Sequence, residues 1–128
     1  MAKESKPPMG FQKVIGLEIE REDGKARARI TIGDEHMNPH GVVHGAVLYS
    51  MADTSMGAAV YTRLADDESC ATIELKMVYI APARDGTLEC ETRLINKGRR
   101  VAVLESDVFN NGRLVAKALG TFAIFPAR

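Results

Sequence analysis

The most informative stretch of the sequence is residues 45–61, which read GAVLYSMADTSMGAAVY. Alanine, leucine and methionine are frequent in this stretch and no proline interrupts it, so it predicts an α-helix from Gly45 to Tyr61. Its apolar residues are spread over every face, and a helix with that distribution belongs inside a structure. The rest of the fold is therefore expected to enclose this one helix.

Alternating apolar and polar residues on both sides of the helix predict strands. Pairs such as Asp23-Gly24 and Asn111-Gly112 indicate tight hairpin turns between some of them. The predicted strands cover residues 14–21, 25–32, 71–80, 87–96, 101–109 and 114–125. Within 71–80, the apolar face is expected to consist of Ile73, Leu75, Met77 and Tyr79.

An antiparallel sheet of about six strands can bury a single helix only by curling around it. The predicted fold is therefore α+β, with one long central helix wrapped by that sheet. Such a sheet keeps an open edge, and an unpaired edge favours pairing with another chain. A second copy of the chain is the expected partner, so the sequence predicts a dimer.

Length and charge limit the remaining choices. The chain has 128 residues, with 17 basic and 17 acidic side chains, which is ordinary for one soluble domain. A zero net charge argues against a nucleic-acid-binding protein and gives no reason to expect binding to an anionic membrane. Pro7-Pro8 predicts a flexible segment over residues 1–9, followed by one domain over 10–128.

No targeting or membrane segment is expected. The N-terminus lacks the apolar core of a signal peptide, and the most apolar stretch, 41–61, is interrupted by Asp53 and several hydroxyl side chains. Cys70 and Cys90 have no metal-binding or redox spacing, so both are expected to be buried, reduced thiols. These features predict a cytoplasmic protein.

Asp53 is the first residue that the predicted fold does not explain. It lies in the middle of the apolar helix, where an unpaired buried carboxylate would cost several kcal/mol. One interpretation is an exposed or hydrogen-bonded aspartate on a polar strip with Ser50 and Thr54. The other is a functional carboxylate.

The segment leading into the helix, NPHGVVHG over residues 38–45, is the second such feature. A helix N-terminus carries unpaired N–H groups and a partial positive charge, so it accepts a negatively charged oxygen. Gly45 has no side chain to block its N–H, although Gly41 and Gly45 also fit a tight loop without any function.

The spacing of Gly45 and Asp53 adds a geometric constraint. Eight residues of helix span about 12 Å, whereas a reacting carbonyl must lie within about 3 Å of both its oxyanion donor and its base or nucleophile. The two groups of one chain therefore cannot act on the same carbonyl. If both are catalytic, the aspartate comes from a neighbouring subunit.

Other candidate chemistries are weaker. His36, His40 and His44 would meet only on a continuous helix, and Pro39 and Gly41 oppose one, so no metal site is expected. Covalent serine or cysteine catalysis is not expected either, because no nucleophile motif is present. The basic residues of the turn over 97–100 fit either a solvated turn or a clamp for phosphates; they are Lys97, Arg99 and Arg100.

The spacing Asn38-x-x-Gly41-x-x-His44-Gly45, with Asp53 nine residues after the histidine, resembles the hotdog-fold acyl-CoA thioesterases. The resemblance is to the phenylacetate-pathway branch, related to 4-hydroxybenzoyl-CoA thioesterase. It extends over about residues 11–125 and includes the segment YIAPA at 79–83. It implies a hotdog fold, a homodimer that often pairs into a tetramer, and hydrolysis of acyl-CoA without a metal or cofactor.

The resemblance also implies roles for individual residues. The Gly45 N–H would polarise the thioester carbonyl, and the partner subunit's Asp53 would act as general base or nucleophile. Asn38 and His44 would position the water or the thioester, and Thr72 would assist beside the carboxylate. Lys97, Arg99 and Arg100 would contact the CoA phosphates. The family often has a second glycine where this chain has Ala46, which is small enough to preserve the site and would narrow the acyl tunnel.

Two alternatives share this fold: an enoyl-CoA hydratase or dehydratase, and a non-catalytic acyl-CoA-binding protein. The position of Asp53 after His44 disfavours the first, and the lack of an attached DNA-binding segment disfavours the second. The acyl group is expected to be aryl or short- to medium-chain. Tyr49, Met51 and Met56 are candidates for lining its pocket, although methionines on a buried helix also fit the core.

Overall fold

The computed structural model describes residues 9–128. The flexible segment expected over residues 1–9 lies outside the described residues except for Met9, so it and the domain boundary stay predictions. The elements are α1 (Gly10–Val14), β1 (Glu18–Glu22), β2 (Lys25–Thr31), the 3-10 helix η1 (Asp34–His36), α2 (Gly45–Tyr61), β3 (Glu68–Tyr79), β4 (Thr87–Lys97), β5 (Val101–Asn110) and β6 (Arg113–Pro126).

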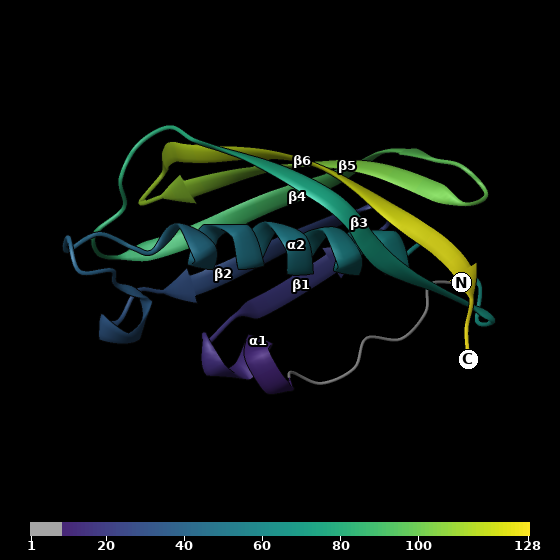
Figure 1. Cartoon of the computed structure of the whole chain (residues 1–128), viewed down its shortest axis with the longest axis horizontal. Coiled ribbons are helices and arrows are strands. Elements are labelled where there is room, and N and C mark those ends of the chain that lie inside the picture. Colours follow the sequence, from purple (N-terminus) through teal and green to yellow (C-terminus); the bar gives the residue numbers. More distant parts are fainter. Residues whose placement is uncertain (1–8) are drawn as a thin grey trace.

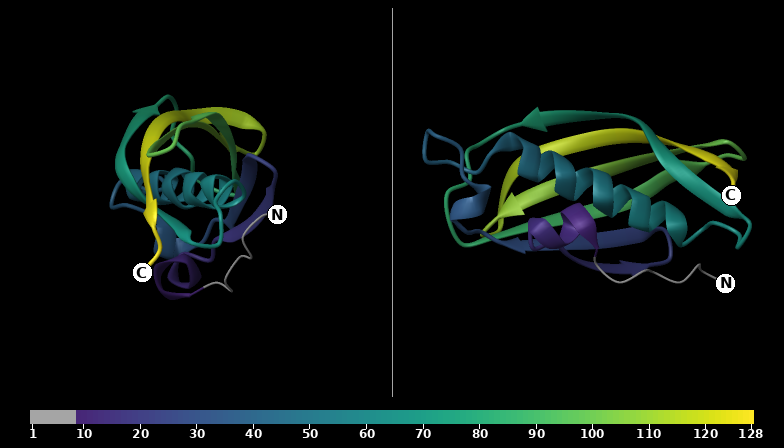
Figure 2. Two further views of the ribbon diagram at one scale, coloured as in Figure 1. Left: turned by 90° about the vertical axis from the view of Figure 1, so that its right-hand side faces the viewer. Right: turned by 60° about the horizontal axis from the view of Figure 1, so that its bottom comes forward.

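The six strands form one antiparallel sheet in the order β1-β2-β4-β5-β6-β3. Figure 1 shows this sheet arched over α2, and the end-on view in Figure 2 shows it curving around the helix. The predicted fold, a central helix wrapped by a curled antiparallel sheet, is therefore confirmed. β3 and β1 are the two edge strands, and β3 has 12 residues.

The start of the domain differs from the prediction. A strand was expected from Val14, but residues 10–14 form the short helix α1 and β1 begins only at Glu18. Gly16, with φ of +67°, ends α1: its N–H donates to the Lys13 carbonyl and the Leu17 N–H donates to the Gln12 carbonyl. This is the double hydrogen bond that a left-handed glycine makes after a helix. The glycine therefore ends a helix at a position where alternation alone predicted a strand.

The two predicted hairpins are present. Glu22 pairs with Lys25 around Asp23-Gly24, and Asn110 pairs with Arg113 around Asn111-Gly112. Asn111 and Gly112 have φ of 50° and 83°, the left-handed conformation that suits a two-residue hairpin turn. The second turn also touches the start of β4, because the Asn111 side chain accepts from the Thr87 N–H.

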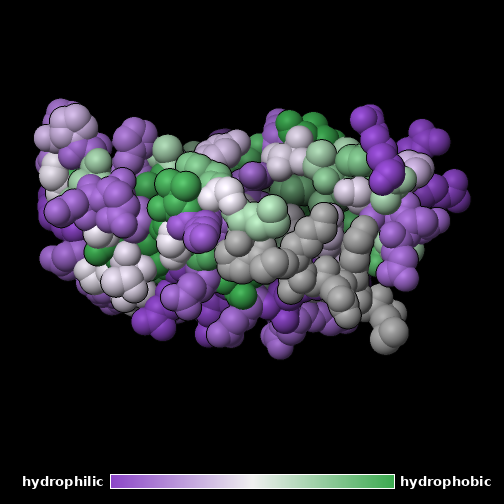
Figure 3. All heavy atoms as spheres, turned by 90° about the horizontal axis from the view of Figure 1, so that it is seen from below, coloured by the Kyte–Doolittle hydropathy of each residue, from purple (hydrophilic) through white to green (hydrophobic). Residues whose placement is uncertain are grey.

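Helix α2 has the predicted bounds, but the chain buries only one of its faces. The buried residues are Val47, Leu48, Met51, Ala52, Ser55, Met56, Ala59 and Val60. The opposite face stays open, which corrects the expectation of a fully enclosed helix, because a single sheet covers one side only. Figure 3 looks onto the open side and shows hydrophobic side chains gathered there between hydrophilic ones.

Strand β3 is less regular than its sequence pattern. Its pairing with β6 shifts register between Thr72 and Glu74, so Ile73 lies in a bulge and is 56% exposed. Tyr79 is 52% exposed, whereas Leu75 and Met77 are half-buried. The expected single apolar face is therefore wrong, since the bulge breaks the alternation and an edge strand is covered on fewer sides.

Two smaller expectations concern the burial of the two cysteines and the absence of a membrane-spanning helix. Cys90 is buried, and burial raises the pKa of its thiol to about 11. Cys70 is half-buried, so the expectation that both thiols are buried is correct for Cys90 only. Within residues 9–128, no helix is long and apolar enough to cross a membrane.

Candidate active site

The N-terminus of α2 presents one open N–H group. His44 is the N-cap, and its Nδ1 accepts from the Ala46 N–H at 3.0 Å. The Val47 N–H donates to the His44 carbonyl at 2.9 Å. Among the described residues, the Gly45 N–H has no acceptor, so it is available to an oxygen brought from outside.

Gly45 borders a pocket of about 400 Å³ whose lining carries no charged side chain. The lining residues are Val43, Gly45, Leu48, Tyr79, Ile80, Ala81, Pro82 and Ala83. Val43, Leu48 and Ala83 are buried and form its floor, while Tyr79 and Ile80 are each 52% exposed and form walls. An apolar pocket beside an unpaired N–H suits an acyl group whose carbonyl oxygen accepts from that N–H.

The loop before α2 is held by Asn38. Its Oδ1 accepts from the His40 N–H at 2.9 Å and from the Val42 N–H at 3.3 Å. Among the described residues, its side-chain NH₂ group has no acceptor. Asn38 is half-buried, so it can organise this loop and still offer a donor toward the site.

Asp53 is half-buried on the open side of α2, one turn after Tyr49. The Thr72 hydroxyl, on β3, donates to Asp53 Oδ1 at 2.6 Å. The pairing of Thr72 with the carboxylate within one chain, which the resemblance implied, is present. The carboxylate is therefore oriented by β3, and its second oxygen, Oδ2, has no hydrogen-bond partner in the described part of the chain.

Three contacts join α2 to the edge strand β3, each from a side-chain hydroxyl on one element to an oxygen atom on the other. We call them the α2–β3 seam. The Tyr79 hydroxyl donates to the Gly45 carbonyl at 2.7 Å, and the Tyr49 hydroxyl lies 3.5 Å from the Leu75 carbonyl oxygen. The Thr72–Asp53 hydrogen bond is the third. Gly45, Tyr49 and Asp53 follow one another at intervals of four residues, so they share one face of the helix.

The structure keeps Gly45 and Asp53 apart. Both lie in the unbroken helix α2, eight residues from each other, which corresponds to about 12 Å along the axis. The chain therefore brings Asp53 to Thr72, and Gly45 to the apolar pocket, but does not bring these two parts together.

The basic residues of the β4–β5 turn are also distant from Gly45. The turn lies level with the start of β3, because Val101, next to Arg100, pairs with Ala123, which pairs with Ala71. Gly45 contacts Tyr79, at the other end of β3. Ala71 and Tyr79 are eight residues apart, which is about 26 Å at the usual rise of a strand. Figure 1 shows this turn beyond the end of α2 that is opposite Gly45. The basic residues are Lys97, Arg99 and Arg100.

The histidines occupy three different environments. His36 is buried, with Nδ1 accepting from the Gly33 N–H at 2.9 Å and Nε2 donating to the Ile15 carbonyl at 2.8 Å. His40 is exposed, and His44 caps α2. Over residues 9–128, no three metal-ligating side chains lie close enough to hold an ion.

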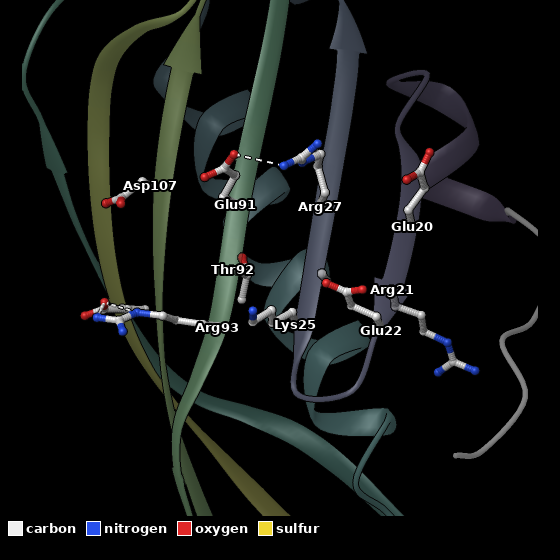
Figure 4. Close-up of a pocket in the computed structure, with 11 residues that line it drawn as sticks. Glu20, Arg21, Glu22, Lys25, Arg27, Glu91, Thr92, Arg93 and Asp107 are labelled. Atoms are coloured by element: carbon white, nitrogen blue, oxygen red, sulfur yellow. Dashed lines mark hydrogen bonds and ion pairs between the residues drawn. The ribbon is translucent and has the colours of Figure 1, made fainter. Parts of the chain in front are cut away.

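A second hollow, of about 520 Å³, opens on the outer face of the sheet across β1, β2, β4 and β5. Figure 4 shows it lined with charged side chains of both signs that stand away from α2. Arg27 pairs with Glu91 at 3.1 Å, and Arg93 pairs with Glu105. No residue of the predicted site lines it, and its balanced ion pairs describe a solvated face.

Sequence reasoning weighed Tyr49 as a pocket residue but did not select Tyr79. Met51 and Met56, weighed with Tyr49, have no exposed surface and belong to the core. Tyr79 could have been noticed from its position, because it is the second-to-last residue of the strand predicted over 71–80 and lies three residues before Pro82. Its contact with Gly45 depends on the tertiary arrangement of β3 and α2, which the sequence pattern does not give.

Comparison with known proteins assigns the family. The model of the thioesterase superfamily matches residues 40–117, more than half of the chain. The medium/long-chain acyl-CoA thioesterase YigI of Salmonella typhimurium is 28% identical over 134 residues, which cover 91% of this chain and 86% of that protein.

Solved structures agree with this assignment. A conserved protein of Pseudomonas aeruginosa is 34% identical, with a TM-score of 0.88, over 92% of this chain and 95% of that one. A variant of the phenylacetic acid degradation protein PaaI of Thermus thermophilus is 29% identical, with a TM-score of 0.81, over 88% and 96%. This chain therefore belongs to the thioesterase superfamily: it is a thioester hydrolase with the hotdog fold.

Proposed function

We propose that this chain hydrolyses the thioester of aryl- or short- to medium-chain acyl-CoA at sites formed between two copies of itself. The observation that carries the proposal is the position of Gly45 and Asp53 on one face of one unbroken helix, about 12 Å apart. A donor and a carboxylate at that separation can meet on one carbonyl only when each comes from a different chain.

The geometry supports a simple division of roles. The Gly45 N–H of one chain binds the carbonyl oxygen and stabilises the negative charge that develops on it. The partner subunit's Asp53, oriented by its own Thr72, takes the proton of the attacking water or attacks the carbonyl carbon itself. The carbon–sulfur bond then breaks, and the CoA thiolate leaves and is protonated. Attack by water gives the free acid directly, whereas attack by Asp53 gives a mixed anhydride that water then hydrolyses to the free acid and the regenerated carboxylate. Asn38 and His44 hold the loop and the helix end around the carbonyl.

The open edge of β3 supports the assembly that these roles require. Ile73, Val78 and Tyr79 are each at least half-exposed along this 12-residue edge strand. An exposed edge strand of this kind favours pairing with a strand of another chain. A two-fold axis pairs two copies of β3 in antiparallel orientation.

The position of that axis follows from the seam. Tyr49 lies midway between Gly45 and Asp53 on the helix, and it contacts Leu75, close to the midpoint between Thr72 and Tyr79 on β3. An axis passing near Tyr49 therefore sets each Gly45 opposite the partner's Asp53. A Tyr49→Cys variant should then form an inter-chain disulfide on mild oxidation, and the unsubstituted chain, with Cys70 and Cys90 only, should not.

The same axis gives the basic turn a function. Antiparallel pairing of two β3 strands places the start of one next to the end of the other, so the partner's β4–β5 turn approaches the Gly45 end. Lys97, Arg99 and Arg100 of one copy would then contact the phosphates of a CoA bound at the other copy's Gly45.

The test is thiol release from a panel of aryl-, short-, medium- and long-chain acyl-CoAs, measured with the unsubstituted chain and with Asp53→Asn. We expect turnover that the Asp53→Asn variant loses while its fold and oligomeric state are retained. Turnover unaffected by Asp53→Asn would contradict the site. No turnover on any member, or hydration of an included enoyl-CoA without thiol release, would contradict the proposed activity.

A further inference from the structure

Tyr79 has no role in the proposed chemistry, yet it makes the closest contacts with Gly45. Its hydroxyl donates to the Gly45 carbonyl at 2.7 Å. A Cβ atom placed on residue 45 would lie 3.1 Å from Cζ and 3.2 Å from Cε1 and the hydroxyl oxygen of Tyr79, which is tighter than ordinary packing. Residue 45 is therefore a glycine for a second reason, since the Tyr79 ring occupies the space of its side chain.

The hydrogen bond fixes the first turn of α2 against β3. Helix ends fray because their terminal groups lack partners within the helix. The His44 side chain holds the Ala46 N–H, and the Ser50 hydroxyl donates to the Ala46 carbonyl at 2.7 Å. Tyr79 is the member of this set that comes from another element, so its hydrogen bond ties the first turn of α2 to the sheet.

The ring of Tyr79 also bounds the apolar pocket. The buried floor of the pocket cannot move back without disturbing the core. The half-exposed walls, Tyr79 and Ile80, therefore limit the space beside the Gly45 N–H. Tyr79 stands directly over Gly45, so its ring limits the part of the acyl group nearest the thioester carbonyl. Burial and the neighbouring Tyr49 raise the pKa of Tyr79, so its hydroxyl remains a hydrogen-bond donor in neutral solution.

We propose that Tyr79 is the residue that both positions the Gly45 donor and selects the acyl group, its hydroxyl anchoring the first turn of α2 and its ring forming the wall of the acyl pocket. This inference rests on the proposed function, because it assumes that the Gly45 N–H receives the thioester oxygen. It separates two properties of one side chain: the hydroxyl acts on the rate, and the ring acts on which acyl groups fit.

Two variants separate these properties. Tyr79→Phe keeps the ring and removes one neutral hydrogen bond, so we expect kcat to fall about fivefold, with KM and the ranking of acyl-CoAs unchanged. Tyr79→Ala removes the wall, so the kcat/KM ratio of bulky to small acyl-CoAs should rise about tenfold or more. Tyr79→Leu serves the same purpose if the alanine variant does not fold.

Leu119→Ala is the matched control. Leu119 lies on β6 and, like Tyr79, is 52% exposed, but it lines neither the pocket nor the β3 edge. We expect its acyl ranking to match that of the unsubstituted chain. A ratio of two kcat/KM values measured on one preparation is independent of how much of the protein is folded, so a merely structural effect of the substitution would not change it.

Unchanged acyl ranking in Tyr79→Ala, or unchanged kcat in Tyr79→Phe, would overturn this proposal. These outcomes are distinct from failure of the proposed function. If only the role of Tyr79 is wrong, the unsubstituted chain still hydrolyses acyl-CoA and Asp53→Asn does not. If the proposed function is wrong, the unsubstituted chain has no acyl-CoA activity to compare.

Discussion

The two faces of helix α2 differ in burial and in the side chains that they carry. One face packs eight residues into the core against the sheet. The other carries Gly45, Tyr49 and Asp53 along the α2–β3 seam, where three polar contacts meet an edge strand that has no further strand neighbour among residues 9–128. Under the proposed function, stability and chemistry are thus separated by a rotation about one helix axis. Substitutions on the two faces should therefore affect different measurements.

The largest expected effect lies on the seam face. Asp53→Asn keeps the size of the side chain and removes its negative charge, so turnover should fall about 10²- to 10⁴-fold. The melting temperature should stay near that of the unsubstituted chain, because Asp53 is only half-buried. Thr54→Ala, the adjacent and equally half-buried position, is the control and should retain activity. Loss of folding in Asp53→Asn would mean that the seam face also carries stability.

Met56→Ala is the corresponding change on the core face. Met56 has no exposed surface, and a Cβ added at Gly120 would lie 2.6 Å from its sulfur, so β6 packs directly on it. Truncating such a side chain should lower the free energy of unfolding by about 2–5 kcal/mol, measured by urea denaturation. The kcat of the molecules that remain folded should be nearly unchanged. A large drop in kcat without loss of stability would contradict the division between the faces.

Thr72→Val should have a smaller effect on the seam. It keeps the shape of the side chain but removes the hydroxyl that donates to Asp53 at 2.6 Å, and kcat should fall about tenfold. Ser69→Ala, at a half-buried position of the same strand, should leave kcat unchanged. A Thr72→Val variant with the normal kcat would show that Asp53 needs no orienting partner.

The smallest effect is expected away from both faces, on the outer side of the sheet. Arg27 and Glu91 form an ion pair at 3.1 Å, with side chains 58% and 52% exposed. Arg27→Ala should change the free energy of unfolding by less than about 1 kcal/mol and leave turnover unchanged. A strong effect on turnover would indicate that the charged hollow of Figure 4 takes part in the function.

Local patterns predicted much of this architecture because the relevant signals are local. Composition and the absence of proline define α2, and Asp23-Gly24 and Asn111-Gly112 define two hairpins. The short helix α1 was missed because Gly16 acts through its left-handed conformation, which alternation does not reveal. The bulge at Ile73 was missed because it exists only relative to β6.

The candidate site was predictable to a similar extent. Helix geometry places Gly45 and Asp53 too far apart for one carbonyl, and that prediction needs only the rise per residue. The contact between Tyr79 and Gly45 depends on which strand becomes the edge and where it crosses the helix, and neither is encoded in a local pattern. Sequence thus indicates candidate site residues more readily than the tertiary contacts around them.

Subunit mixing tests the shared site most directly. Gly45→Pro removes the N–H at the first helical position, where proline is tolerated, and His44, with ψ of 132°, already has the extended backbone that precedes proline. Gly45→Ala is its control, since it adds the same Cβ against the Tyr79 ring and keeps the N–H. Both Gly45→Pro and Asp53→Asn should be inactive as pure proteins.

When the two inactive variants are unfolded together and refolded as an equal mixture, half of the dimers contain one copy of each. Each mixed dimer then has one site with an intact Gly45 from one chain and an intact Asp53 from the other. A site shared between subunits predicts recovery of about a quarter of the unsubstituted activity, because half of the dimers are mixed and each mixed dimer has one active site of two. A mixture that forms mixed dimers but stays inactive would show that each chain uses its own Asp53, and would contradict the shared site.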